Sequence, residues 1–124
     1  MNSGSDTGAV LAAAQARHRA GEIAEAMVVY REILEREPDN PAALHLLGVA
    51  SLQTGEVEAA VGLLERAKRL MPANGDVLNN LGESYRVLGR DEEAINAYRA
   101  ALVVAPDHAG ALGNLARYRT DDGA

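Results

Sequence analysis

The chain of 124 residues contains no cysteine, and its only aromatic residues are four tyrosines. The lack of cysteine excludes disulfide bonds, thiolate metal sites, cysteine nucleophiles and lipid attachment at cysteine. No long apolar run is present, so we expect no membrane insertion. The N-terminal segment lacks the basic and apolar pattern of a secretory signal. We therefore expect a soluble, cytoplasmic protein.

Positive charge is also scarce, with 12 basic against 18 acidic residues and a net charge of −6. A nucleic-acid-binding surface needs clustered basic side chains, so this balance argues against a nucleic-acid partner. His18, His45 and His108 lie far apart without metal-ligand spacing, and we interpret them as solvated or partly packed. The sequence has no Gly-rich phosphate loop and no Ser-His-Asp grouping. We therefore predict no metal, no cofactor and no enzymatic activity.

Proline, glycine and alanine recur along the chain at a fixed interval of 34 residues. The positions are Pro38, Pro72 and Pro106; Gly21, Gly55 and Gly89; and Ala26, Ala60 and Ala94. A period of this length indicates an array in which one helical hairpin is copied and stacked. Such an array presents an extended surface rather than a buried catalytic pocket.

The period divides the chain into three repeats and a closing helix. We predict a disordered tail over 1–6, repeats over 7–40, 41–74 and 75–108, a closing helix over 109–120 and a second tail over 121–124. Within the third repeat, apolar residues recur at helical spacing until Gly89, which ends the first helix as a left-handed residue. Pro106 then blocks the second helix. No segment alternates as a strand does, so the predicted fold class is all-α.

The third repeat carries an ordered set of residues: Leu78, Leu81-Gly82, Tyr85, Ala94, Tyr98 and Pro106. This order resembles the tetratricopeptide repeat family, whose pattern is an apolar anchor, Leu-Gly, an aromatic, alanine, an aromatic and proline. The two earlier repeats keep the same register without an insertion. The resemblance implies a right-handed α-α superhelix of three helical hairpins plus a C-terminal capping helix, with the first helix of each hairpin lining a concave groove.

The closing helix carries Arg117 and Arg119 near its end. Repeat arrays need a polar cap at each end, and these residues are typical of one. We therefore read 109–120 as the last helix of a complete array. The alternative is that the chain is a piece of a longer array.

The resemblance also assigns residues to the groove. They are His45, Leu46, Val49, Leu52, Gln53, Asn79, Asn80, Glu83, Arg86, Asn114 and Arg117. Amides at such positions can pair with a peptide backbone, and arginines can hold a carboxylate with two hydrogen bonds. The expected partner is therefore a protein or extended peptide that carries an acidic group.

These assignments have structural alternatives. Leu46, Val49 and Leu52 form an apolar strip that can equally pack against neighbouring helices, and Glu83 can neutralise Arg86. An exposed apolar strip can also mark an interface between copies of the chain. A homo-oligomer therefore stays among the alternatives.

Three functions follow, of which a non-catalytic, protein- or peptide-binding scaffold is the main prediction. The second is a targeting array detached from a larger bacterial enzyme of glycosyltransferase or sulfotransferase type. Asn80 and Asn114 favour it because they resemble two rungs of the asparagine ladder of O-linked N-acetylglucosamine transferases, which Leu46 and Ala12 interrupt. The third is a self-assembling scaffold. The composition is compatible with a bacterial source.

Overall fold

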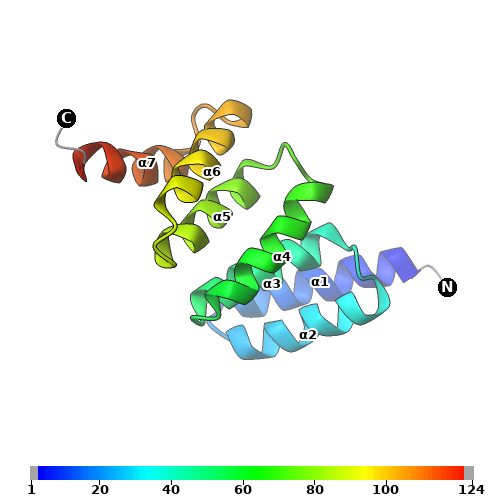
Figure 1. Ribbon diagram of the computed structural model, residues 1–124. Coiled ribbons are helices and arrows are strands. Elements are labelled where there is room, and N and C mark those ends of the chain that lie inside the picture. The colour runs from blue at the N-terminus through cyan, green and yellow to red at the C-terminus, as the bar shows by residue number, and fades with distance from the viewer. Residues whose placement is uncertain (1–2, 122–124) are drawn as a thin grey trace.

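The computed structural model describes residues 3–121, and it places side chains from Asp6 to Tyr118. Over that range the chain forms seven helices and no strand (Figure 1). They are α1 (Ser3–Arg19), α2 (Ile23–Arg36), α3 (Pro41–Gln53), α4 (Val57–Leu70), α5 (Gly75–Val87), α6 (Asp91–Val104) and α7 (Ala109–Asp121). The first six helices make three hairpins in chain order, and α7 follows them, so the predicted all-α architecture is confirmed.

The N-terminal boundary differs from the prediction of a disordered tail over 1–6. Helix α1 begins at Ser3, so residues 3–6 are helical, while residues 1–2 lie outside the described part. No proline interrupts this segment, and the Asp6 carboxylate in the first turn complements the helix dipole. Thr7 is buried and its hydroxyl donates to Glu37 at 2.5 Å, which holds α1 against the end of α2.

The C-terminal boundary lies close to the predicted one. Helix α7 continues to Asp121, whereas the closing helix was predicted to end at residue 120. Of the predicted tail over 121–124, residue 121 is therefore helical, and residues 122–124 lie outside the described part.

Each hairpin turns at a glycine with a positive φ angle. Gly21, Gly55 and Gly89 have φ of 91°, 86° and 76°, a region that residues with a Cβ rarely adopt. After Gly89 the Arg90 N–H donates to the Tyr85 carbonyl at 2.9 Å, which closes the end of α5. The predicted role of Gly89 as the residue that ends a helix is confirmed.

A side-chain cap precedes each of the helices α3, α5 and α7. Asn40, Asn74 and His108 each accept a hydrogen bond from the backbone N–H three residues on, at 3.0, 3.0 and 3.1 Å. Because Nδ1 of His108 accepts this bond, its Nε2 carries the proton and donates to Asp76 at 2.7 Å. These caps recur with the repeat period and mark the start of α3, α5 and α7.

The hairpins are tightly packed at small residues. The three alanines that recur near the start of α2, α4 and α6 are fully buried. A Cβ added to Gly48 would lie 2.7 Å from Leu64, and one added to Gly82 would lie 2.5 Å from the Tyr98 ring. Glycine is therefore required where the two helices of the second and third hairpins approach.

The first helices of the hairpins form a continuous layer. Helix α1 contacts α3, α3 contacts α5, and α5 contacts α7. Among the described residues, α2, α4 and α6 have no Cα atoms within 8 Å of one another. The first helices are thus the more crowded layer, so the array curves with this layer on its inner side. Helices α1 and α7 lie at opposite ends of the array (Figure 1).

Candidate functional site

We define the inner face as the surface that α1, α3, α5 and α7 present away from the second helices. The predicted groove residues all belong to these helices. They are His45, Leu46, Val49, Leu52 and Gln53 on α3; Asn79, Asn80, Glu83 and Arg86 on α5; and Asn114 and Arg117 on α7. Gln53 and Arg117 are exposed and the others are half-buried, so the set can serve packing and binding at once.

Two polar pairs join neighbouring first helices. The Asn80 amide nitrogen lies 3.3 Å from His45 Nε2, and the Asn114 amide donates to Asn79 Oδ1 at 3.0 Å. In both pairs the partners are 35 residues apart, which is one repeat plus one residue. The structure therefore brings four predicted residues together as two hydrogen-bonded rungs.

The state of His45 follows from its position between α3 and α5. Burial lowers the pKa of this histidine, and the Asp76 carboxylate opposes that effect only in part. The ring is therefore neutral near pH 7, and a neutral Nε2 can accept the hydrogen bond from Asn80.

A third polar pair, which the sequence interpretation missed, joins α1 to α3. His18 Nε2 lies 2.6 Å from Gln53 Oε1, and His18 Nδ1 lies 3.0 Å from the Tyr30 hydroxyl. His18 and Gln53 are again 35 residues apart, so this spacing was the signal in the sequence.

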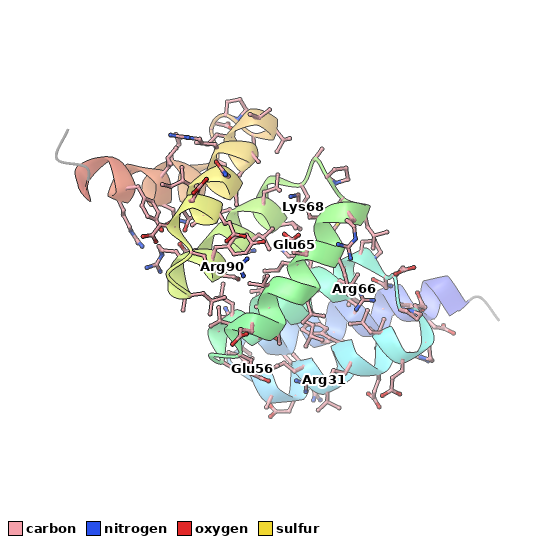
Figure 2. The ribbon with its side chains drawn as sticks, in the orientation of Figure 1. Arg31, Glu56, Glu65, Arg66, Lys68 and Arg90 are labelled. Atoms are coloured by element: carbon pink, nitrogen blue, oxygen red, sulfur yellow. The ribbon has the colours of Figure 1, made fainter. Side chains whose placement is uncertain are left out.

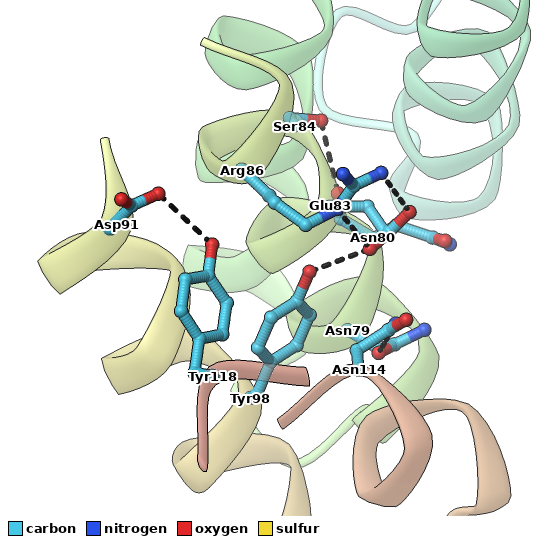
Figure 3. A network of polar contacts seen from close by, with 9 residues as sticks. All are labelled: Asn79, Asn80, Glu83, Ser84, Arg86, Asp91, Tyr98, Asn114 and Tyr118. Carbon is cyan, nitrogen blue, oxygen red and sulfur yellow. Dashed lines mark hydrogen bonds and ion pairs between the residues drawn. The ribbon is translucent and has the colours of Figure 1, made fainter. Parts of the chain in front are cut away.

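Glu83 is the centre of a polar network on α5 (Figure 3). Arg86 donates to both of its carboxylate oxygens, at 3.1 and 3.3 Å, and the Tyr98 hydroxyl donates to it at 2.6 Å. Burial raises the pKa of Glu83, but the hydrogen bonds from Arg86 and Tyr98 outweigh it and leave the pKa below its usual value. Glu83 is thus held as a charged carboxylate.

This network changes the interpretation of the two groove arginines. Arg86 is already paired with Glu83, the structural alternative that the sequence left open. Arg117 is exposed and has no ion pair with any residue that the structure describes. Of the two, Arg117 has the guanidinium that is available to an acidic ligand.

Two tyrosines position the network and were not predicted as site residues. Tyr98 is fully buried on α6, and burial followed by the contact with Glu83 raises its pKa. The Tyr118 hydroxyl donates to Asp91 at 3.1 Å, and its ring centroid is 6.3 Å from that of Tyr98 (Figure 3). Together they link α7 and α5 through α6.

The apolar strip has a double role. Leu46 packs against the core cluster of the first two repeats, and Leu52 packs against the cluster around Leu81 and Tyr98. Each is only half-buried, so part of each side chain still faces the inner surface. The packing role of Leu46 and Leu52 is thus observed, and their role in binding stays a prediction.

Membrane-spanning and metal-binding features were also sought. None of the described helices is both long and apolar enough to cross a bilayer. Over the same residues, His, Asp and Glu side chains form no group of three or more that could hold a metal ion.

Family models place the chain among known proteins. Two models, both described as tetratricopeptide repeat, match residues 17–77 and 75–108. Cellulose synthase 2 operon protein C of Komagataeibacter xylinus is 36% identical over 99 residues, which cover 78% of this chain and 8% of that protein. The BBSome complex member bbs-4 of Caenorhabditis elegans is 31% identical over 94 residues, which cover 76% of this chain and 20% of that protein. The chain thus spans only a fraction of these relatives.

Solved structures agree with this assignment. A mutant of the O-GlcNAc transferase of Thermobaculum terrenum superposes with a TM-score of 0.89 and 30% identity, covering 93% of this chain and 22% of that one. The first tetratricopeptide domain of Spaghetti (RPAP3), bound to the HSP90 peptide SRMEEVD, has a TM-score of 0.87 and 18% identity, covering 95% and 94%. Both share the array of stacked helical hairpins described above.

Proposed function

Since the chain belongs to the tetratricopeptide repeat family, we propose that it is a non-catalytic module that binds a protein or an extended peptide along its inner face. The observation that carries this proposal is the row of polar pairs on contacting first helices, beside a half-exposed apolar strip. Rigid hairpins hold these side chains in place before a ligand arrives, which lowers the cost of ordering on binding.

The side chains indicate what the ligand offers. Amides of Asn79, Asn80 and Asn114 keep hydrogen-bonding capacity beyond the single bonds they make with each other and with His45, so they can meet a peptide backbone. Arg117 can pair with an acidic group. A neighbour of the same fold is bound to the acidic HSP90 peptide SRMEEVD, which supports this class of ligand.

The test compares two triple variants in capture from a lysate of the source cells, followed by titration of each captured protein. The inner-face variant carries Asn80→Ala, Asn114→Ala and Arg117→Ala. The matched control carries Glu58→Ala, Arg69→Ala and Arg99→Ala, which are exposed on the second helices. We expect the inner-face variant to lose the partner and the control to keep it, with unchanged circular dichroism for both.

Two results would contradict the proposal. Equal binding by the native chain and the folded inner-face variant would remove the inner face as the site. Loss of the partner in the control alone would move the site to the outer surface.

A second candidate function is a targeting array within a larger enzyme. It is favoured by the 30% identity to the O-GlcNAc transferase, of which this chain matches 22%, and by the resemblance of Asn80 and Asn114 to two rungs of the asparagine ladder. The reading frame that encodes the chain distinguishes the two, because only this candidate requires a catalytic domain in the same polypeptide.

A further inference from the structure

A cavity lies on the opposite side of the array from the inner face, between α4 and α6. It encloses about 260 Å³ and is floored by Leu78, Leu81 and Tyr85 of α5. These three side chains are buried, whereas Glu65 and Lys68 of α4 stand at the rim. Figure 2 shows Glu65 and Lys68 beside the gap between the two second helices. We call this feature the outer cleft.

The outer cleft is open because two aliphatic side chains of the preceding junction are replaced. Leu34 and Leu63 lie at the junction of the first and second repeats, and both pack against the core clusters there. One period of 34 residues later, the chain has Lys68 and Ala97, both of which line the cleft. The volume that leucines fill at the first junction is thus left accessible at the second.

The wall of the outer cleft is held in place before any ligand binds. The Tyr85 hydroxyl donates to Glu65 at 2.9 Å, and the Arg90 guanidinium lies 4.8 Å from the centre of its ring. Burial, followed by the bond to Glu65, raises the pKa of Tyr85 to about 12. The phenol therefore stays neutral and keeps this bond over the physiological pH range.

The three charged side chains that line the cleft differ in their partners among the described residues: Glu93 has an ion pair, Glu65 has only a hydrogen bond from a neutral hydroxyl, and Lys68 has neither. Glu93 receives both of its hydrogen bonds from Arg90, at 2.7 and 2.6 Å, and Glu65 accepts from Tyr85. Lys68 is exposed, and its ammonium group makes no hydrogen bond or ion pair with any residue that the structure describes. Of the three charged side chains that line the cleft, Lys68 is therefore the one that makes no hydrogen bond within the described part of the chain.

We propose that the outer cleft binds a short segment of a protein partner in which one aliphatic side chain stands next to one carboxylate. The aliphatic group covers Leu78 and Leu81, and the carboxylate pairs with Lys68. The cavity is smaller than the roughly 300–1,000 Å³ that is typical of small-molecule sites, which suits a single side chain. The outer cleft is a separate surface from the inner face, so this inference stands independently of the proposed function.

The test is a titration of the ¹⁵N-labelled chain, followed by NMR, with the capped peptides Gly-Leu-Asp-Gly and Gly-Asp-Leu-Gly. The two orders cover both directions of binding, and Gly-Leu-Asn-Gly is the uncharged control. We expect amide shifts at Leu81, Tyr85 and Ala97 with at least one acidic peptide, and none at Asn80 on the inner face. The uncharged peptide should bind about tenfold more weakly.

Matched variants test separately whether binding depends on the charge of Lys68 and on the open volume of the outer cleft. Lys68→Gln should weaken binding about tenfold, whereas Arg69→Gln, the same kind of change one residue along α4, should leave it unchanged. Ala97→Leu should fill the cleft and abolish binding, and its circular dichroism and Tm show whether it folds. If Ala97→Leu does not fold, the comparison of Lys68→Gln with the native chain still tests whether binding needs the Lys68 charge.

Several outcomes would overturn the inference. One is the absence of shifts with both acidic peptides at millimolar concentration. Another is an equal effect of Lys68→Gln and Arg69→Gln, because it would indicate unspecific attraction. Cleft shifts that appear on raising the protein concentration without peptide would show that a second copy of the chain occupies the cleft instead.

Discussion

The two junctions between repeats share a backbone plan but differ in chemistry. The first junction is filled by Leu34 and Leu63, whereas the second has Lys68 and Ala97 at the same positions and a cavity between α4 and α6. A repeat period thus fixes where helices lie and leaves each junction free to be either a filled core or an accessible surface.

The inner edges of the two junctions, where α1 meets α3 and α3 meets α5, also differ in chemistry, but in opposite directions at two pairs of positions. At the first junction the matching positions are Leu11 and Leu46, which pack against the core cluster. At the second they are His45 and Asn80, which form a polar pair at 3.3 Å. At a second pair of positions the order is reversed: His18 and Gln53 form a polar pair at 2.6 Å at the first junction, and the matching residues of the second are Leu52 and Val87. Each junction therefore combines apolar and polar residues, placed differently along the first helices.

The largest expected effect comes from Tyr85, whose counterpart at the first junction is Ser51. Tyr85→Ala removes a buried ring and the bond to Glu65, so the free energy of unfolding should fall by about 3–4 kcal/mol. Ser51→Ala should cost about 1 kcal/mol or less, because only a small hydroxyl is lost. Urea denaturation of both variants measures the difference.

The variant Tyr85→Phe is the control for this prediction. It keeps the ring and should cost only about 1 kcal/mol, the contribution of one hydrogen bond. Equal losses for Tyr85→Ala and Ser51→Ala would mean that the second junction does not depend on this ring.

The second-largest change in stability is expected when the first junction receives the residues of the second junction. Leu34→Lys with Leu63→Ala removes two half-buried aliphatic side chains, which should cost about 2–3 kcal/mol. Thermal unfolding should show a lower Tm. An unchanged Tm would indicate that these leucines do not hold the first two repeats together.

The reciprocal exchange should have the opposite sign and a smaller size. Lys68→Leu with Ala97→Leu places apolar volume in the outer cleft, and we expect the free energy of unfolding to rise by about 1 kcal/mol. The same denaturation assay measures it. A loss of stability would show that the cleft cannot accommodate two leucines and that its shape is fixed by the backbone.

The smallest effect concerns pH at the inner edge of the second junction. The folded chain lowers the pKa of His45 from its usual value of 6.5, so below that pH the unfolded chain binds more protons. The stabilising contribution of neutral His45 is therefore present above pH 6.5 and is lost as the pH falls through the lower, folded value.

The variant His45→Asn tests this pH dependence, because it copies the rung formed by Asn79 and Asn114 and cannot titrate. The native chain should lose up to about 1 kcal/mol more stability than the variant between pH 7 and pH 5. Identical pH profiles would show that His45 has the same pKa in both states.

The period in the sequence was enough to predict the hairpins, because glycines and prolines act locally on the backbone. It also placed the groove residues on the first helices, where the structure has them. It could not decide whether Arg86 faces a ligand or Glu83, because that depends on side-chain geometry within α5. The outer cleft was missed because its opening requires knowing that Lys68 of α4 and Ala97 of α6 line the same cavity.

The separation of the second helices has a mechanical consequence. Because each second helix packs against the next first helix, while α2, α4 and α6 do not approach one another, neighbouring hairpins are joined at the inner side and in the middle of the array but not along its outer side. Bending that widens or narrows the gaps between second helices leaves the glycine-packed interior of each hairpin unchanged. We therefore expect the curvature of the array to change more readily than its length along the first helices.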